Sequence, residues 1–181
     1  PKGVWLTGPI VLESRIELHL QKGAVLLFTP DKTAYFDKDE NGNPIVNGRA
    51  KPCIYAEKAE DVCISGEGAI DGNGQYWRYA KREKYDDKEW AQFLKMGGTV
   101  SGDGKFWFPY NLKGFANITS DPQKEESIRQ HLMIFKRCSR VLISGVTVRN
   151  SPKFHINPAQ CSDLVIDGVT VTCPWNDQYG D

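Results

Sequence analysis

The chain has 181 residues, and its 23 Lys and Arg balance 23 Asp and Glu, so the formal net charge at pH 7 is zero. A composition of 40% hydrophobic and 25% charged residues excludes a disordered or low-complexity chain, and the zero net charge argues against a nucleic-acid or membrane-surface binder. Apolar runs such as residues 24–28 are far shorter than the roughly 20 residues that a membrane-spanning helix needs. The length predicts a single domain over residues 1–181, or a segment of a larger one.

Short strands are predicted near the N-terminus. Ile16, Leu18 and Leu20 alternate with polar residues, which is the period-two pattern of a strand with one buried face. Gly23 interrupts this alternation, and residues 25–28 resume an apolar run. Two strands separated by a bend are therefore expected in this region.

The next segment contains the beginning of a calcium-binding loop. Residues 37–42 read DKDENG, but Gly48 stands where such a loop needs a bidentate Glu. A turn is the better interpretation, and the sequence gives no reason to expect a metal or any other cofactor.

Residues 75–130 form a long excursion without the strand pattern. A helix is predicted from about Asp86 to residue 96, because Asp86 and Glu89 have the spacing of a capping pair and residues 97–98 are a Gly-Gly stop. A second, polar helix is predicted for residues 120–131.

Aromatic side chains are frequent in this excursion. They include Tyr76, Trp77, Trp90, Phe106, Trp107, Phe108 and Tyr110. Flat rings stack on sugar faces, so a rim of them could close one end of a cleft and favour attack at chain termini. The interpretation that we favour for any single ring is packing, with Trp90 and Phe93 attaching the inserted helix to the β-helix described below.

An internal repeat follows the excursion. CSRVLISGVTV (138–148) realigns with CSDLVIDGVTV (161–171) at an offset of 23 residues. AEDVCISGEGAIDG (59–72) is a looser third copy with two extra residues after its first glycine. The apolar alternation changes phase at residues 144–145, which predicts a bend there.

A further strand per copy is predicted at residues 132–135 and 155–158. A coil of three short strands cannot bury its own inner face, whereas stacked copies about 4.8 Å apart pair each strand with its equivalent. Val141 is then expected to lie on Leu164.

The predicted architecture is therefore all-β, a parallel β-helix with a partly helical insertion at about residues 75–130. A barrel or sandwich would need two-residue hairpin turns, which the repeats lack. Five cysteines without a C-x-x-C pair are expected to be free thiols, even Cys138 and Cys161, which the repeat places on adjacent coils.

Four runs of the sequence resemble bacterial members of glycoside hydrolase family 28, the polygalacturonase family. In order they are GVWLTGPIVLESRIELHLQKGAVLLF, ISGEGAIDGNGQYW, VLISGVTVRNSPKFHINP, and VIDGVTVTCPW leading to QYGD. The resemblance implies a right-handed parallel β-helix and hydrolysis of galacturonate linkages in homogalacturonan or rhamnogalacturonan, without a cofactor. It also implies a pectic polysaccharide or oligogalacturonide as substrate, and a secreted or periplasmic location. Nothing in the sequence indicates a nucleic-acid or membrane partner, and it leaves the oligomeric state open.

The resemblance implies one catalytic residue within the chain. Residues 179–181, YGD, resemble the family's N-T-D or N-G-D motif, which gives Asp181 the role of a carboxylate flanking the scissile bond. The repeat puts Asp181 in the strand column of Phe135 and Pro158. Tyr179 replaces the usual Asn, and Asp177 a commonly small residue, so altered specificity or weaker catalysis is expected.

The remaining motifs of the family, paired aspartates, G-H-G and R-I-K, would lie beyond residue 181. The chain is therefore interpreted as a truncated segment of a longer enzyme. An inverting mechanism needs two carboxylate functions, so this segment alone is expected to be inactive.

A uronate substrate needs cations to hold its carboxylates. Lys153 and His155 are the candidates, because the repeat puts them one coil before Asp181, and Gln178 is a further substrate-binding candidate from the resemblance. The alternative is a solvated Lys153 and a structural His155.

Two other functions remain open. A polysaccharide lyase on the same fold would use calcium and a basic residue, and its products would absorb ultraviolet light. A non-catalytic β-helix would bind carbohydrate without turnover.

Overall fold

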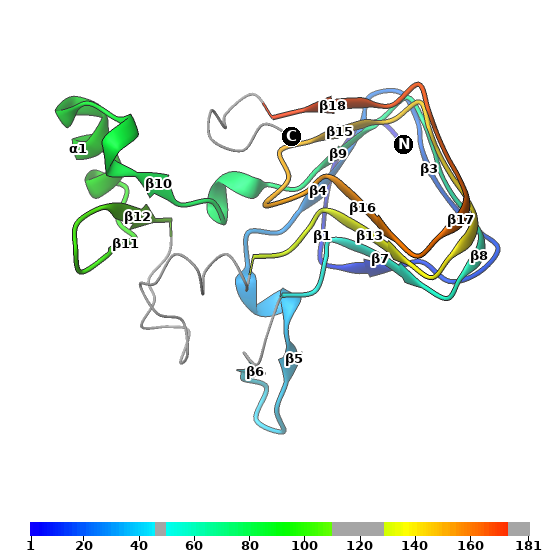
Figure 1. Cartoon of the computed structure of the whole chain (residues 1–181), viewed down its shortest axis with the longest axis horizontal. Helices are drawn as coiled ribbons and strands as arrows, with labels where there is room; N and C mark the ends of the chain where they lie inside the picture. Colours follow the sequence, from blue (N-terminus) through cyan, green and yellow to red (C-terminus); the bar gives the residue numbers. More distant parts are fainter. Residues whose placement is uncertain (46–49, 110–128, 174–181) are drawn as a thin grey trace.

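The computed structural model describes residues 1–45, 50–109 and 129–173. Most of its strands wind into successive coils with parallel pairing between coils, as Figure 1 shows. Three parallel sheets result, and we name them sheet A, sheet B and sheet C. The parallel pairing between coils confirms the predicted parallel β-helix. Among the described helices, none is long and apolar enough to cross a membrane.

The three sheets take one strand each from successive coils. Sheet A has the order β1 (Gly3–Thr7), β4 (Ala24–Phe28), β9 (Ala69–Asp71), β15 (Thr147–Arg149) and β18 (Thr170–Thr172). Sheet B has the order β16 (Ile156–Ala159), β13 (Met133–Lys136), β7 (Ile54–Glu57) and β2 (Ile10–Val11). Sheet C has the order β17 (Ser162–Asp167), β14 (Ser139–Ser144), β8 (Glu60–Gly66) and β3 (Ile16–Leu20).

The register between coils follows the repeat. Val141 pairs with Leu164, as predicted, and on its other side with Val62. The third copy is also confirmed, but Ile143 pairs with Ile64 while Thr147 pairs with Ala69, so the earlier copy has one extra residue instead of two. Like residues thus lie over like residues and form continuous apolar columns.

The corner between sheets C and A requires glycine. Gly145 has φ +75°, and a Cβ there would lie 2.7 Å from the carbonyl oxygen of Gly66. A Cβ on Gly66 would lie 2.1 Å from the carbonyl oxygen of Leu20, which is shorter than any real contact. Successive backbones therefore touch at this corner, and the predicted bend at residues 144–145 is confirmed.

The core of the β-helix is a cluster of buried apolar side chains. Its fully buried side chains include Phe28, Ile64, Phe135 and Ile143. All five cysteines are free thiols, as predicted. Burial raises the pKa of the Cys53 thiol to about 12, so it stays protonated at neutral pH.

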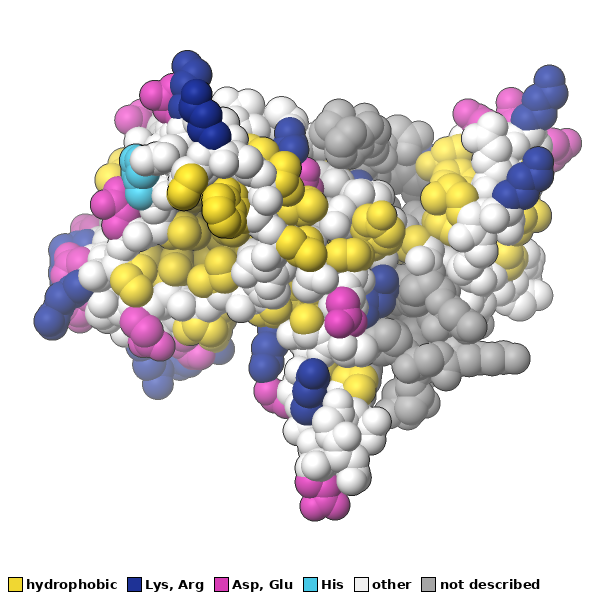
Figure 2. All heavy atoms as spheres, turned by 180° about the vertical axis from the view of Figure 1, so that it is seen from behind, with side chains coloured by type: hydrophobic (Ala, Val, Ile, Leu, Met, Phe, Trp, Pro, Cys, Tyr) yellow, Lys and Arg dark blue, Asp and Glu magenta, His cyan; other side chains and the backbone are white. Residues whose placement is uncertain are grey.

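The two ends of the coil stack expose apolar side chains. Figure 2 shows such an area over the first coil, where Val4, Leu6 and Val11 are exposed. At the other end Ile166 continues the column of Ile143 but is 47% exposed, because no described strand covers it. Aliphatic side chains are buried here only where a second coil lies over them.

A hairpin projects from the segment between β4 and β7, which leads the chain from sheet A to sheet B. Its strands β5 (Asp37–Lys38) and β6 (Pro44–Ile45) are antiparallel, after the short 3-10 helix η1 (Lys32–Tyr35). Asp39 accepts hydrogen bonds from the backbone N–H groups of Asn41 and Asn43. The predicted turn is therefore confirmed.

The insertion between β9 and β13 contains a small unit of its own. It has the 3-10 helices η2 (Gly74–Tyr76) and η3 (Arg82–Lys84), the helix α1 (Asp87–Lys95), and an antiparallel sheet of β10 (Ala80–Lys81), β12 (Phe106–Phe108) and β11 (Thr99–Val100). The capping box predicted for Asp86 and Glu89 is present, and Gly97 follows the helix with φ +83°. The second predicted helix lies largely outside the described residues, and residues 129–131 are not helical.

The packing of the inserted helix differs from the prediction. Trp90 packs in a separate cluster with Ala80 and Trp107, and the Phe93 ring contacts that of Trp107 at a tilt of 41° with centroids 4.9 Å apart. Trp90 and Phe93 therefore attach α1 to the strands of the insertion and not to the β-helix. Figure 1 shows this unit beside the coils, joined to them through the segment that follows β9.

Candidate functional site

The outer face of sheet B is the side of the solenoid toward which the long excursions lead. The chain enters β7 from the segment that carries the β5–β6 hairpin, and it enters β13 from the insertion. In Figure 1 the hairpin extends outward from the corner where β7 and β13 begin. Excursions at the entry edge of a sheet are where repeat folds usually build binding surfaces.

Side chains in sheet B alternate between core and outer face. Met133 and Phe135 of β13 are fully buried, whereas Ile134 and Lys136 are half-buried on the outer side. Phe135 pairs in register with Pro158. The column to which the repeat assigns Asp181 is therefore an inward-facing column.

This orientation constrains the Asp181 prediction. Because side chains alternate with period two, a shift of one residue moves a side chain from the core to the outer face. Asp181 and Gln178 lie outside the described residues, as do Tyr179 and Asp177.

One carboxylate stands on the outer face of sheet B itself. Glu57 accepts a hydrogen bond of 2.5 Å from the Tyr55 hydroxyl, forms an ion pair with Arg137, and lies 3.4 Å from Lys136 Nζ. The hydrogen bonds from Tyr55 and Arg137 lower the pKa of Glu57 to about 2. Glu57 is therefore ionised at neutral pH and unsuited to donate a proton as a general acid.

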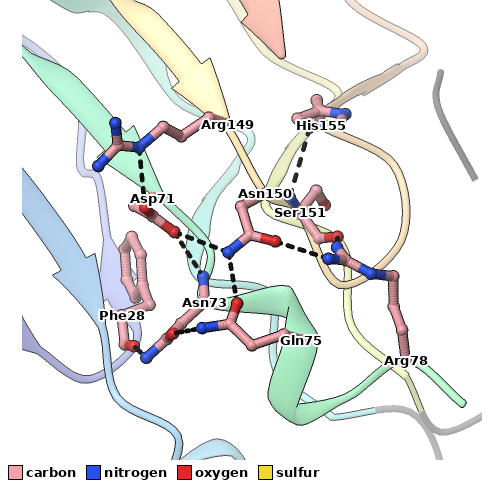
Figure 3. Close-up of polar contacts among 9 residues, drawn as sticks. All are labelled: Phe28, Asp71, Asn73, Gln75, Arg78, Arg149, Asn150, Ser151 and His155. Carbon is pink, nitrogen blue, oxygen red and sulfur yellow. Dashed lines mark hydrogen bonds and ion pairs between the residues drawn. The ribbon is translucent and has the colours of Figure 1, made fainter. Parts of the chain in front are cut away.

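A polar network occupies the base of the insertion (Figure 3). Asp71, buried at the end of β9, accepts from Arg149 Nε at 2.8 Å and from Asn150 Nδ2 at 3.2 Å. Asp71 Oδ1, the oxygen that accepts from Asn150, also accepts the backbone N–H of Asn73, whose left-handed φ of 53° turns the chain toward η2. Asn73 Nδ2 in turn donates to the carbonyl of Phe28. The network ties three coils together where the insertion leaves.

Arg78 extends this network to the turn before β16. Its Nη1 donates to the Ser151 carbonyl at 2.6 Å, and its Nη2 donates to Asn150 Oδ1 at 2.7 Å. The side chain is only 7% exposed, and burial is the largest cause of its lowered pKa. Arg78 is thus a buried cation that links the insertion to the last described turn into sheet B.

The structure brings Lys153 and His155 into that same turn. His155 is 4% exposed, and its Nε2 accepts the Ser151 backbone N–H at 3.4 Å. It lines a cavity of about 250 Å³ together with Phe154, Ile156 and Val171. Lys153 is half-buried, and its backbone N–H donates to Ser151 Oγ. These contacts agree with the structural alternative for His155 while leaving its ring at the wall of a cavity.

Sequence reasoning missed Asp71, Arg78 and Asn150. The repeat as read from the sequence, with two extra residues in the earlier copy, aligns Asp71 with Val148, so the pairing of Asp71 with Arg149 on the adjacent coil became visible only in the structure. Arg78 gave no signal, because it lies in the excursion. Within the residues described, no group of three or more His, Cys, Asp or Glu is arranged to hold a metal ion.

The sequence of this chain is similar to those of known glycoside hydrolases. The sequence profile described as "Glycosyl hydrolases family 28" matches residues 92–181. A "Probable polygalacturonase" of Vitis vinifera is 27% identical over 180 residues, 96% of this chain and 29% of that protein. The "Exo-poly-alpha-D-galacturonosidase" of Dickeya chrysanthemi is 25% identical over 191 residues, covering 100% of this chain and 31% of that protein. These matches support membership of the chain in glycoside hydrolase family 28.

A solved family 28 structure has the same fold. The exopolygalacturonase of Yersinia enterocolitica superposes with a TM-score of 0.66 at 19% identity, covering 96% of this chain and 32% of that one. At this identity the likeness bears on the fold alone. The chain spans less than a third of the length of these family 28 relatives.

Proposed function

We propose that this chain is a β-helix domain, residues 1–181, within a longer family 28 enzyme that hydrolyses galacturonate linkages of the pectin backbone. The observation that carries the proposal is the family 28 match over residues 92–181, a range that includes the QYGD run. The relatives' names, polygalacturonase and exo-poly-alpha-D-galacturonosidase, give the substrate class. Their greater length supports a role as one segment of a larger enzyme, and we propose a secreted or periplasmic location from the polymeric substrate.

The proposed mechanism is inverting. One carboxylic acid protonates the leaving oxygen while carboxylates roughly 6.5–9.5 Å away activate water on the opposite side of the sugar. Asp181 is proposed to belong to the carboxylates that activate water. The general acid would come from the longer protein, with its pKa raised by neighbouring carboxylates.

Lys153, His155 and Gln178 are proposed to hold the substrate. Lys153 and His155 belong to the turn that leads into β16, at the entry edge of sheet B. A lysine ammonium there would bind a uronate carboxylate as a point charge, and the His155 ring lines the adjoining cavity of about 250 Å³. Substitution Lys153→Met in the longer enzyme is expected to raise KM about tenfold with kcat nearly unchanged. A drop in kcat alone would contradict a binding role.

The proposed function is tested by product analysis on polygalacturonate. The longer protein should release reducing ends whose first-formed anomer is inverted, and Asp181→Asn should reduce turnover at least a hundredfold. The 181-residue chain alone should release none. Products that absorb ultraviolet light would instead identify a lyase, and binding of polygalacturonate without turnover by the longer protein would identify a non-catalytic domain.

A further inference from the structure

A cavity of about 290 Å³ lies within the insertion, close to its base. Its wall includes five aromatic side chains: Tyr76, Tyr79, Tyr85, Phe93 and Trp107. Several of these rings are fixed by one another, since Tyr85 and Phe93 have centroids 4.8 Å apart and Phe93 and Trp107 4.9 Å. Trp107 is further held by a hydrogen bond of 2.7 Å from its Nε1 to the Gly97 carbonyl. The walls are therefore preformed flat apolar surfaces.

A buried cation completes the wall. Arg78 lines the cavity and is 7% exposed. Two of its five N–H donors are used on the Ser151 carbonyl and on Asn150 Oδ1, both neutral oxygens. Among the described residues, the hydrogen bonds of this buried guanidinium go to neutral acceptors, and a carboxylate is the partner that best offsets the cost of burying its charge.

A second arginine lies at the cavity wall. The guanidinium of Arg129 lies 6.0 Å from the ring centroid of Tyr79, another residue of the wall. Burial is the main cause of the lowered pKa of Arg78, Arg129 lowers it further, and Cys173 and Asp71 act to raise it. Asp71, the carboxylate nearby in the network, already pairs with Arg149 at 2.8 Å. The cavity thus combines aromatic walls with a buried guanidinium, a combination that suits an anion with an apolar face.

We propose that this cavity binds a single hexuronate ring, with its carboxylate on Arg78 and its less polar face on the aromatic wall. The volume is at the lower end of the range for small-molecule sites, which suits one sugar ring and not an oligosaccharide. The choice of a uronate among carboxylated ligands rests on the proposed function. All the described residues that line the cavity belong to the insertion, and none of them lies in sheet B.

The two methionines of the chain give a direct test. Met96 lines the cavity, and Met133 is fully buried in the β-helix core. Protein labelled with ¹³C at the methionine methyl groups should therefore give two resonances. Titration with D-galacturonate is expected to shift the Met96 resonance in a saturable manner and leave the Met133 resonance in place. D-galactose, which lacks the carboxylate, should bind at least tenfold more weakly.

Variants locate the site. Arg78→Gln should weaken galacturonate binding at least tenfold, whereas Arg140→Gln, a change in an exposed arginine that pairs with Glu60 and Asp61, should leave it unchanged. A Met133 resonance that moves in Arg78→Gln would show that this substitution has changed the fold. The Tyr76→Ala variant then takes the place of Arg78→Gln in the binding test. Tyr76 is 44% exposed, and its loss should weaken binding at least threefold.

Three results would overturn the inference: no Met96 shift at saturating galacturonate, equal binding of galactose, or unchanged affinity in a correctly folded Arg78→Gln or Tyr76→Ala protein. The measurement requires no turnover. An enzyme that hydrolyses polygalacturonate but shows no Met96 shift refutes the cavity site alone. A Met96 shift specific to galacturonate, together with a longer protein that does not hydrolyse polygalacturonate, supports the cavity site and refutes the proposed function.

Discussion

The coils and the insertion reach stability in different ways. In the coils, each inward side chain lies on its equivalent one coil away, as Val141 does on Leu164 and Val62. In the insertion, Trp90, Trp107 and Ala80 form a cluster separate from the core of the β-helix. This chain therefore contains one extended core, in which each coil needs the next coil to bury its side chains, and one small core in the insertion, whose side chains pack mainly on one another.

The largest effect should come from the interior of the coils. Phe135→Ala removes a fully buried ring and should lower the free energy of unfolding by about 3–5 kcal/mol. Ile134→Ala, on the outer side of the same strand, should cost roughly 1 kcal/mol. Urea denaturation measures both. Equal losses would mean that the alternation in β13 does not separate core from surface.

The glycine corner should give the next largest effect. Gly66→Ala forces a Cβ to within 2.1 Å of the Leu20 carbonyl oxygen at a φ of +105°, so we expect a loss of at least about 2 kcal/mol. Gly8→Ala meets nothing within 4 Å and should change stability by less than about 1 kcal/mol. Comparable denaturation midpoints for the two variants would contradict the close stacking at this corner.

A substitution in the insertion should act locally. Trp90→Ala removes the helix residue of the small cluster, so amide exchange in α1 should accelerate about tenfold to a hundredfold while strands β8 and β14 keep their protection. Leu94→Ala, on the exposed side of the same helix, is the matched control and should accelerate exchange far less. Exchange followed by mass spectrometry decides the outcome. Lost protection in the coils would show that the two cores are one cooperative unit.

The smallest effect is a pH dependence on the outer face of sheet B. The pKa of Glu57 is about 2 in the folded protein against an ordinary value of 4.5, so its contribution is fully present above pH 4.5 and is lost as the pH falls toward 2. Wild-type protein should therefore lose more stability between pH 5 and pH 3 than Glu57→Gln. The control Glu67→Gln, at an exposed pair with Lys22, should follow the wild-type profile. Identical profiles for wild type and Glu57→Gln would contradict the ion pairs of Glu57.

The coils could be predicted from sequence because stacking repeats the same physical demand in each turn. The 23-residue offset gave the pairing of Val141 with Leu164, and the phase change gave the corner at Gly145. The helix α1 was found through its capping box, which is a local signal. The strands of the insertion were not found, because β10 and β11 have two residues each and show no period.

The candidate site was less accessible to sequence reasoning. The repeat assigned Asp181 to a strand column, but only the burial of Phe135 revealed that this column faces inward. The cavity in the insertion depends on contacts between residues far apart in the chain, such as Arg78 with Ser151. No spacing rule predicts such contacts, since an irregular excursion can return to the coils in many ways.

The pairing of β7 with β13 has a consequence for how this protein can change over time. These strands are neighbours in sheet B although the whole insertion separates them in sequence. The entropy of closing a loop grows only with the logarithm of its length, so exchanging the insertion for a shorter or longer one costs the adjoining strands little. The β-helix can therefore carry loops of different length and specificity at this position, while the hydrogen bond between Asn150 and Asp71 holds the place where such a loop joins the coils.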